Sequence, residues 1–98
     1  MSCEIVRWTE DGFPGRVEAR LIDADGTVWT FEDKAPVFSA EALSATTSYP
    51  VPGSIRCVIV DEDVAVGRTT IDTSSPDGIA ANDRRTIRFS MASRAVAP

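Results

Sequence analysis

The sequence predicts an all-β fold, most simply a small six-stranded antiparallel barrel, with a β-sandwich as the alternative. Short runs rich in β-branched and aromatic residues alternate with glycine, proline and aspartate at intervals of about 10 residues. A length of 98 residues suits one core, so we expect a single barrel domain over residues 1–98. Closure of the sheet would remove its exposed edges.

The first half of the chain is expected to hold three strands, over residues 3–9, 16–22 and 28–33. In the second of these, Val17, Ala19 and Leu21 alternate with charged residues, which is the period of a sheet with one wet face. The pair Asp25 and Gly26 then predicts a hairpin, because both residues tolerate the positive φ of a tight turn.

The second half is expected to hold one short helix near residues 39–44 and three strands, over residues 54–60, 64–72 and 84–91. Ser39 can cap the helix, and the alanine, glutamate and leucine that follow favour it. Residues 54–60 are apolar on both faces, which predicts the most buried strand. Residues 61–63 should form the turn after it, and residues 93–98 a loose tail.

The composition argues against catalysis. The chain has no histidine, the usual general base and the usual partner of a nucleophilic serine or cysteine. Its two cysteines, Cys3 and Cys57, lie far apart and are expected to be reduced, buried thiols. The sequence therefore predicts a protein that is not an enzyme and that uses no cofactor and no metal.

Residues 21–27 read Leu-Ile-Asp-Ala-Asp-Gly-Thr and resemble the first motif of haloacid-dehalogenase-type phosphatases, an apolar strand followed by D-x-D-G-T. The resemblance would make Asp23 the nucleophile and Asp25 the general acid. That family needs a parallel sheet flanked by helices, a downstream lysine and a further acidic pair. We therefore interpret the motif as a hairpin turn and rank a phosphatase-like enzyme last among the functions considered.

Charge and hydropathy restrict the partners. Fifteen acidic and ten basic residues give a net charge of −5, which disfavours nucleic acid and suits a basic protein. The longest apolar run, residues 57–60, is far shorter than the ~20 residues of a membrane span. Residues 1–10 lack the apolar stretch of a signal peptide, so we expect a cytoplasmic protein without a membrane partner.

Residues 15–60 resemble, in shortened form, the C-terminal β-barrel of elongation factor Tu. The similarity lies in a charged strand, a turn, the Pro-Val-Phe-Ser segment at residues 36–39, and Pro52-Gly53 opening an apolar strand. That barrel contacts partners and performs no catalysis. The resemblance implies a stand-alone small bacterial barrel with a binding role.

These observations predict a non-catalytic binding module that acts through protein contact, such as an immunity-type or accessory protein, with a small-molecule-binding barrel as the alternative. Residues 73–83 exceed the usual hairpin connection of about 2–5 residues, and long loops are commonly functional. Two other interpretations of residues 73–83 are an inert spacer and a loop whose Ile79 side chain joins the core. Partner contact is assigned to Phe13, Ser75, Asp77 and Ile79. Ligand lining, in the alternative, is assigned to Trp8, Trp29 and Tyr49.

Overall fold

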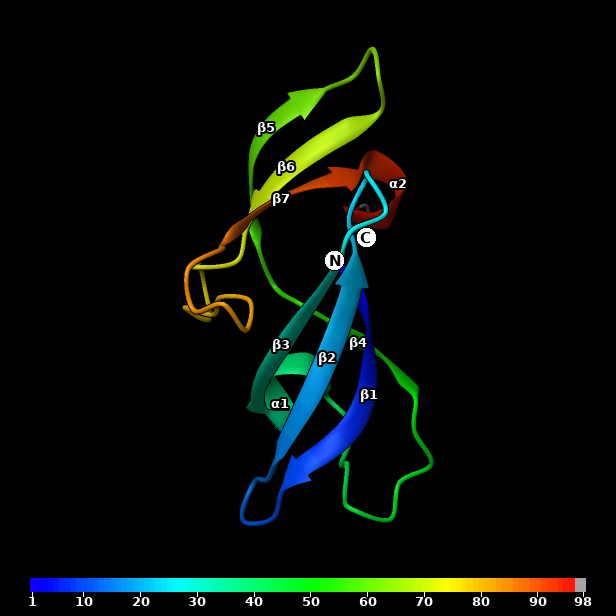
Figure 1. Cartoon of the computed structure of the whole chain (residues 1–98), viewed down its shortest axis with the longest axis vertical. Helices are drawn as coiled ribbons and strands as arrows, with labels where there is room; N and C mark the ends of the chain where they lie inside the picture. The colour runs from blue at the N-terminus through cyan, green and yellow to red at the C-terminus, as the bar shows by residue number, and fades with distance from the viewer. Residues whose placement is uncertain (97–98) are drawn as a thin grey trace.

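The computed structural model describes residues 1–96, and in them seven strands form two antiparallel sheets (Figure 1). The first sheet has the order β3-β2-β1-β4, with β1 (Ser2–Glu10), β2 (Arg16–Ile22), β3 (Val28–Lys34) and β4 (Val51–Ser54). The second has the order β5-β6-β7, with β5 (Val58–Asp63), β6 (Arg68–Asp72) and β7 (Arg88–Ala92). The all-β class is confirmed, but these sheets do not close into a six-stranded barrel.

The first three strands form where the sequence predicts them. β2 pairs with β3 without interruption from Arg16 opposite Lys34 to Ile22 opposite Val28, so the predicted hairpin is confirmed. Its connection is longer than a two-residue turn and occupies residues 23–27. The Asp23 carboxylate holds this loop, because its Oδ1 accepts the backbone N–H groups of residues 25 and 27, both at 2.9 Å.

The prediction for residues 54–60 is wrong. The chain leaves the first sheet after Ser54, and β5 begins in the second sheet at Val58. Between them Ile55 is buried against the first sheet, and its backbone exchanges hydrogen bonds of 2.8 and 3.1 Å with Met1. All six residues of β5 are exposed, because neither face of this strand is covered. Residues 61–63 belong to β5 and do not form the turn.

The two helices also differ from expectation. Helix α1 (Ala35–Phe38) precedes the predicted segment at 39–44, because Pro36 suits a first helical turn and Phe38 is drawn into the core. Ser39 already has an extended backbone and ends the helix. Residues 93–96 of the predicted tail form α2 (Ser93–Val96), while residues 97–98 lie outside the described residues. Neither described helix is long and apolar enough to cross a membrane.

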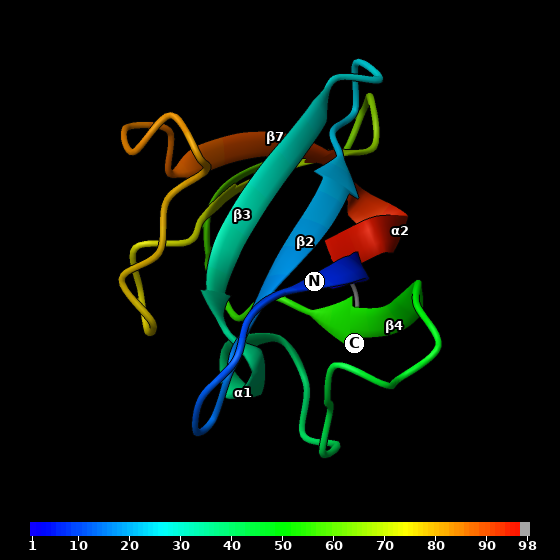
Figure 2. The same cartoon turned by 60° about the horizontal axis from the view of Figure 1, so that its bottom comes forward.

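One hydrophobic core joins the two sheets. Its buried members come from the first sheet, including Ile5 and Phe31, and from the second, including Ile71 and Phe89. Figure 2 shows β7 passing behind β3, and the contact there is aromatic. The Phe89 ring meets Phe31 and Trp29 edge to face, with centroids 5.6 and 5.3 Å apart. Two antiparallel sheets therefore share one core without closing into a barrel.

Candidate binding surfaces

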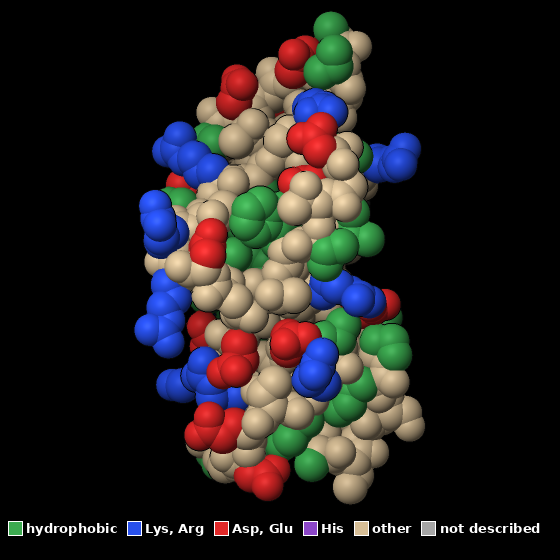
Figure 3. All heavy atoms as spheres, viewed as in Figure 1, with side chains coloured by type: hydrophobic (Ala, Val, Ile, Leu, Met, Phe, Trp, Pro, Cys, Tyr) green, Lys and Arg blue, Asp and Glu red, His purple; other side chains and the backbone are tan. Residues whose placement is uncertain are grey.

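The large apolar side chains that remain exposed gather on one hairpin. Among the described residues eight large hydrophobic side chains are exposed, and five lie in β5 or in the turn that leads to β6: Val58, Ile59, Val60, Val64 and Val66. We name these five residues, together with acidic residues 61–63, the hairpin surface. Figure 3 shows hydrophobic and acidic side chains together at the upper end of the molecule, where Figure 1 places this hairpin. Clustered exposed apolar groups of this kind mark interaction sites.

One edge of β5 has no backbone partner in residues 1–96. The strand stands at the end of the order β5-β6-β7 and pairs with β6 alone, from Val58 opposite Asp72 to Asp63 opposite Arg68. The register shifts between residues 59 and 61, which places a bulge at Val60. The other edge therefore presents free N–H and C=O groups that could pair with another chain.

The carboxylates of the hairpin surface are uncompensated. Six ion pairs are present in the part of the chain that the structure describes, and none includes Asp61, Glu62 or Asp63. Arg68 lies opposite Asp63 in the ladder, but its guanidinium binds Asp25 at 2.8 Å. By contrast, three of the ion pairs neutralise the outer face of the first sheet. Unpaired negative charge is thus concentrated beside the exposed apolar residues.

A second surface is an apolar groove of about 580 Å³ beneath the turn between β1 and β2, which we name the turn groove. Trp8 forms one wall and donates its indole N–H to Asp11 Oδ1 at 2.7 Å. Phe13 stands fully exposed at the rim, and Glu41 is the one charged residue of the lining. Volume and lining suit a small organic molecule.

The three aromatic residues expected to line a ligand site are not brought together. Trp8 lines the turn groove, where it meets Phe13, a residue predicted for partner contact. Trp29 instead packs on Phe89 in the core and donates its indole N–H to Asp23 Oδ2 at 2.9 Å. The Tyr49 hydroxyl donates to a backbone carbonyl in its own loop, at residue 44.

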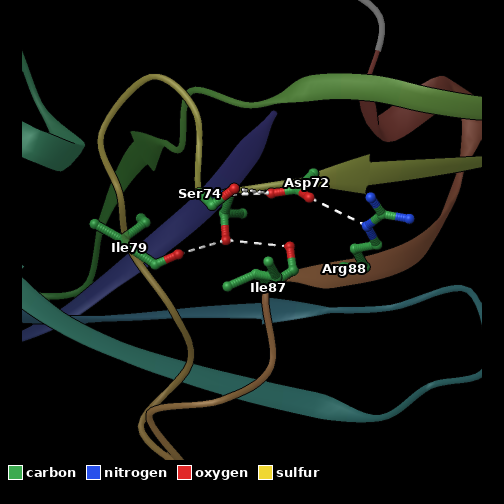
Figure 4. A network of polar contacts seen from close by, with 6 residues as sticks. Asp72, Ser74, Ile79, Ile87 and Arg88 are labelled. Carbon is green, nitrogen blue, oxygen red and sulfur yellow. Dashed lines mark hydrogen bonds and ion pairs between the residues drawn. The ribbon is translucent and has the colours of Figure 1, made fainter.

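The loop after β6 is held against the core and is not a free tip (Figure 4). The buried Thr73 hydroxyl donates to the Ile79 carbonyl at 2.7 Å and lies 3.3 Å from the Ile87 carbonyl. The Ile79 side chain is only 5% exposed and belongs to the core cluster. Its assignment as a contact residue is therefore wrong, because the loop folds back and turns the side chain inward.

The other two loop residues have different surroundings. Ser75 is exposed, whereas the Asp77 carboxylate receives two hydrogen bonds from the Arg56 guanidinium. This ion pair ties the loop to the segment between β4 and β5. Of the four predicted contact residues, Phe13 and Ser75 are freely accessible, but they do not belong to the hairpin surface. The hairpin surface was not predicted, because the apolar run at residues 54–60 predicts a buried strand.

The Asp23 carboxylate and the Cys3 thiol have shifted pKa values. Burial alone would raise the pKa of Asp23, but hydrogen bonds from Trp29 and from backbone N–H groups outweigh it and lower that pKa. Burial raises the pKa of the Cys3 thiol to about 11, so it is protonated at neutral pH. Within residues 1–96 no three acidic or cysteine side chains gather in a way that could hold a metal ion.

Acid should destabilise the protein through Asp72. The hydroxyl and backbone N–H of Ser74 and the guanidinium of Arg88 all donate to this carboxylate and lower its pKa (Figure 4). The unfolded chain then takes up the proton first, so the free energy of unfolding should fall as pH drops below about 4. Urea denaturation between about pH 6 and pH 3 measures this loss, which Asp72→Asn should reduce. An identical pH dependence in the variant would contradict the role of Asp72.

A comparison with protein-family models, with curated proteins and with solved structures finds no match to this chain.

Proposed function

We propose that this protein is a non-catalytic binding module that acts through protein contact and that its contact is the hairpin surface. The observation that carries the proposal is the gathering of five of the eight large exposed apolar side chains on one hairpin. Burying apolar surface contributes a free energy of about 25 cal/mol per Å², and these five side chains stay exposed after folding. A partner that buries them would gain this free energy.

The charge of the surface suggests the kind of partner. Three unpaired carboxylates beside an apolar patch suit a basic protein, whose approach they would also accelerate. An immunity-type or accessory protein is one form that this binding role could take. Both cysteines are free thiols, which suits a reducing compartment, and we propose the cytoplasm.

Polar substitution at the hairpin tip should abolish partner binding and leave the fold intact. Val64→Ser with Val66→Ser removes two exposed side chains, so its melting temperature should match that of the wild type. Affinity capture from the native lysate should recover a stoichiometric basic protein with the wild type and at least about tenfold less with this variant.

Ile22→Ser with Val28→Ser is the matched control. These two residues pair across β2 and β3, are each more than half exposed and lie outside the hairpin surface. The control should retain the partner. The proposal fails if the wild type recovers no stoichiometric partner, or if the control loses it as fully as the hairpin variant does.

A small-molecule site in the turn groove is the second candidate, favoured by its volume of about 580 Å³ between Trp8 and Phe13. A metabolite that binds there should change tryptophan fluorescence in a saturable way. Phe13→Ser should weaken that binding several-fold while changing the free energy of unfolding by less than about 0.5 kcal/mol, because the ring is fully exposed. Equal affinity in the variant, or no responding metabolite, would contradict a ligand at this groove.

A further inference from the structure

We propose that the partner adds a strand to the free edge of β5, running antiparallel to it, with basic residues that precede apolar ones. The inference rests on the proposed function, because it specifies what the hairpin surface recognises. The basic residues of the partner would lie beside Asp61, Glu62 and Asp63, and its apolar residues beside the run from Val58 to Val60.

The backbone step follows from the topology. Every strand pair in the described sheets is antiparallel, and the free edge of β5 is an open ladder of donors and acceptors. An extended peptide that joins such an edge gains main-chain hydrogen bonds, and the antiparallel arrangement is slightly more stable per residue than the parallel one. Strand addition would extend the second sheet on the side where it now ends.

The side chains give the partner a direction. β5 reads Val-Ile-Val-Asp-Glu-Asp, an apolar half followed by an acidic half, with the bulge at Val60 between them. An antiparallel segment begins opposite Asp63, so its first residues meet carboxylates and its later ones meet Val58 and Ile59. Charged side chains on an edge strand also disfavour unwanted strand pairing. In β5 the charges occupy residues 61–63 only, so the apolar residues 58–60 remain open to pairing.

A second copy of this chain fits the edge less well. Two-fold pairing centred on Ile59 would place acidic residues 61–63 opposite residues 57 to 55 of the other copy. The backbone of Ile55 is already bonded to Met1, and the one cation there, Arg56, is already paired with Asp77. Three carboxylates would therefore meet no free positive charge, whereas a basic segment compensates all three.

Two peptides of identical composition test the direction. The peptide Lys-Arg-Lys-Thr-Val-Ile-Val carries the proposed order, and Val-Ile-Val-Thr-Lys-Arg-Lys reverses it. With fluorescent labels and polarisation measurements, the first should bind at least about tenfold more tightly and shift the backbone amide resonances of β5. N-methylation at alternate residues should remove its binding, and added salt should weaken it.

Variants test the charges. Asp61→Asn, Glu62→Gln and Asp63→Asn together should weaken the first peptide at least about tenfold. A control that removes three unpaired carboxylates elsewhere, Glu10→Gln, Asp33→Asn and Glu41→Gln, should weaken it far less, although the net charge changes equally.

The inference is overturned if both peptide directions bind equally, if the N-methylated peptide binds like its parent, or if both triple variants behave alike. It is also overturned if sedimentation shows a wild-type dimer that Val58→Ser with Val60→Ser dissociates, because the occupant would then be a second copy. The proposed function has a separate test, because it depends only on whether the variant Val64→Ser with Val66→Ser loses the partner that the wild type captures from the lysate.

Discussion

Phe89→Ala should lower the free energy of unfolding by about 3–5 kcal/mol, a large part of the roughly 5–15 kcal/mol typical of small domains. Phe89 is 3% exposed and lies on β7, where its ring meets Trp29 and Phe31 of the first sheet edge to face. Truncation removes buried area, leaves a cavity and removes both aromatic contacts. The two sheets would lose the contact that joins them most directly.

Urea denaturation measures this loss, and Phe13→Ala is its matched control. The same atoms are removed there from a fully exposed ring, so the change should stay within about 0.5 kcal/mol. The melting temperature of the Phe89 variant should fall by about 4–8 °C for each kcal/mol. A loss below about 1 kcal/mol would mean that the sheets are held together by other contacts.

The first sheet could be predicted because its signals are local. Val17, Ala19 and Leu21 alternate with charged residues, and the structure buries all three on one face. Asp25 and Gly26 mark the hairpin that follows, even though the loop proved longer than a two-residue turn. Alternation and turn chemistry depend on near neighbours in the chain, so tertiary structure did not override them.

In the second sheet, β6 and β7 overlap the strands predicted at residues 64–72 and 84–91, but β5 could not be predicted because its apolar run is ambiguous. A strand with apolar residues on both faces suits a site covered on both sides, but the same residues occur in β5, where neither side is covered. The break between β4 and β5 depends on Ile55, which packs against the first sheet and bonds to Met1. That contact joins residues far apart in the chain and has no local signal.

Among the candidate site residues, too, some predictions agree with the structure and others fail because of contacts between distant parts of the chain. The sequence assigns Phe13 to partner contact, and the structure leaves its ring exposed. Ile79 was also assigned to partner contact because its loop is long, but the hydrogen bonds of Thr73 fold that loop back onto the core. The signal for the hairpin surface was present in the acidic run that follows Val60, which suits an edge strand as well as a turn.

Gly15→Ala should destabilise the protein by about 2–5 kcal/mol and disturb the turn groove. Gly15 has a φ of 82°, which costs an L-residue about 1–2 kcal/mol, and a Cβ there would lie 2.1 and 2.3 Å from ring atoms of Trp8. Displacing a packed indole adds about 1–3 kcal/mol. The Trp8 ring would move away from Asp11, which now accepts its N–H, so the indole resonance of Trp8 should shift.

Gly26→Ala separates the two causes of that loss. Its φ of 83° matches that of Gly15, but nothing lies within 4 Å of a Cβ at this position. The control therefore carries the backbone strain alone, about 1–2 kcal/mol, and should leave the Trp8 indole resonance in place. Denaturation curves and indole N–H spectra of both variants give the comparison. Equal losses and an unmoved Trp8 signal would show that the ring does not pack on Gly15, and the turn groove would lose the wall that defines it.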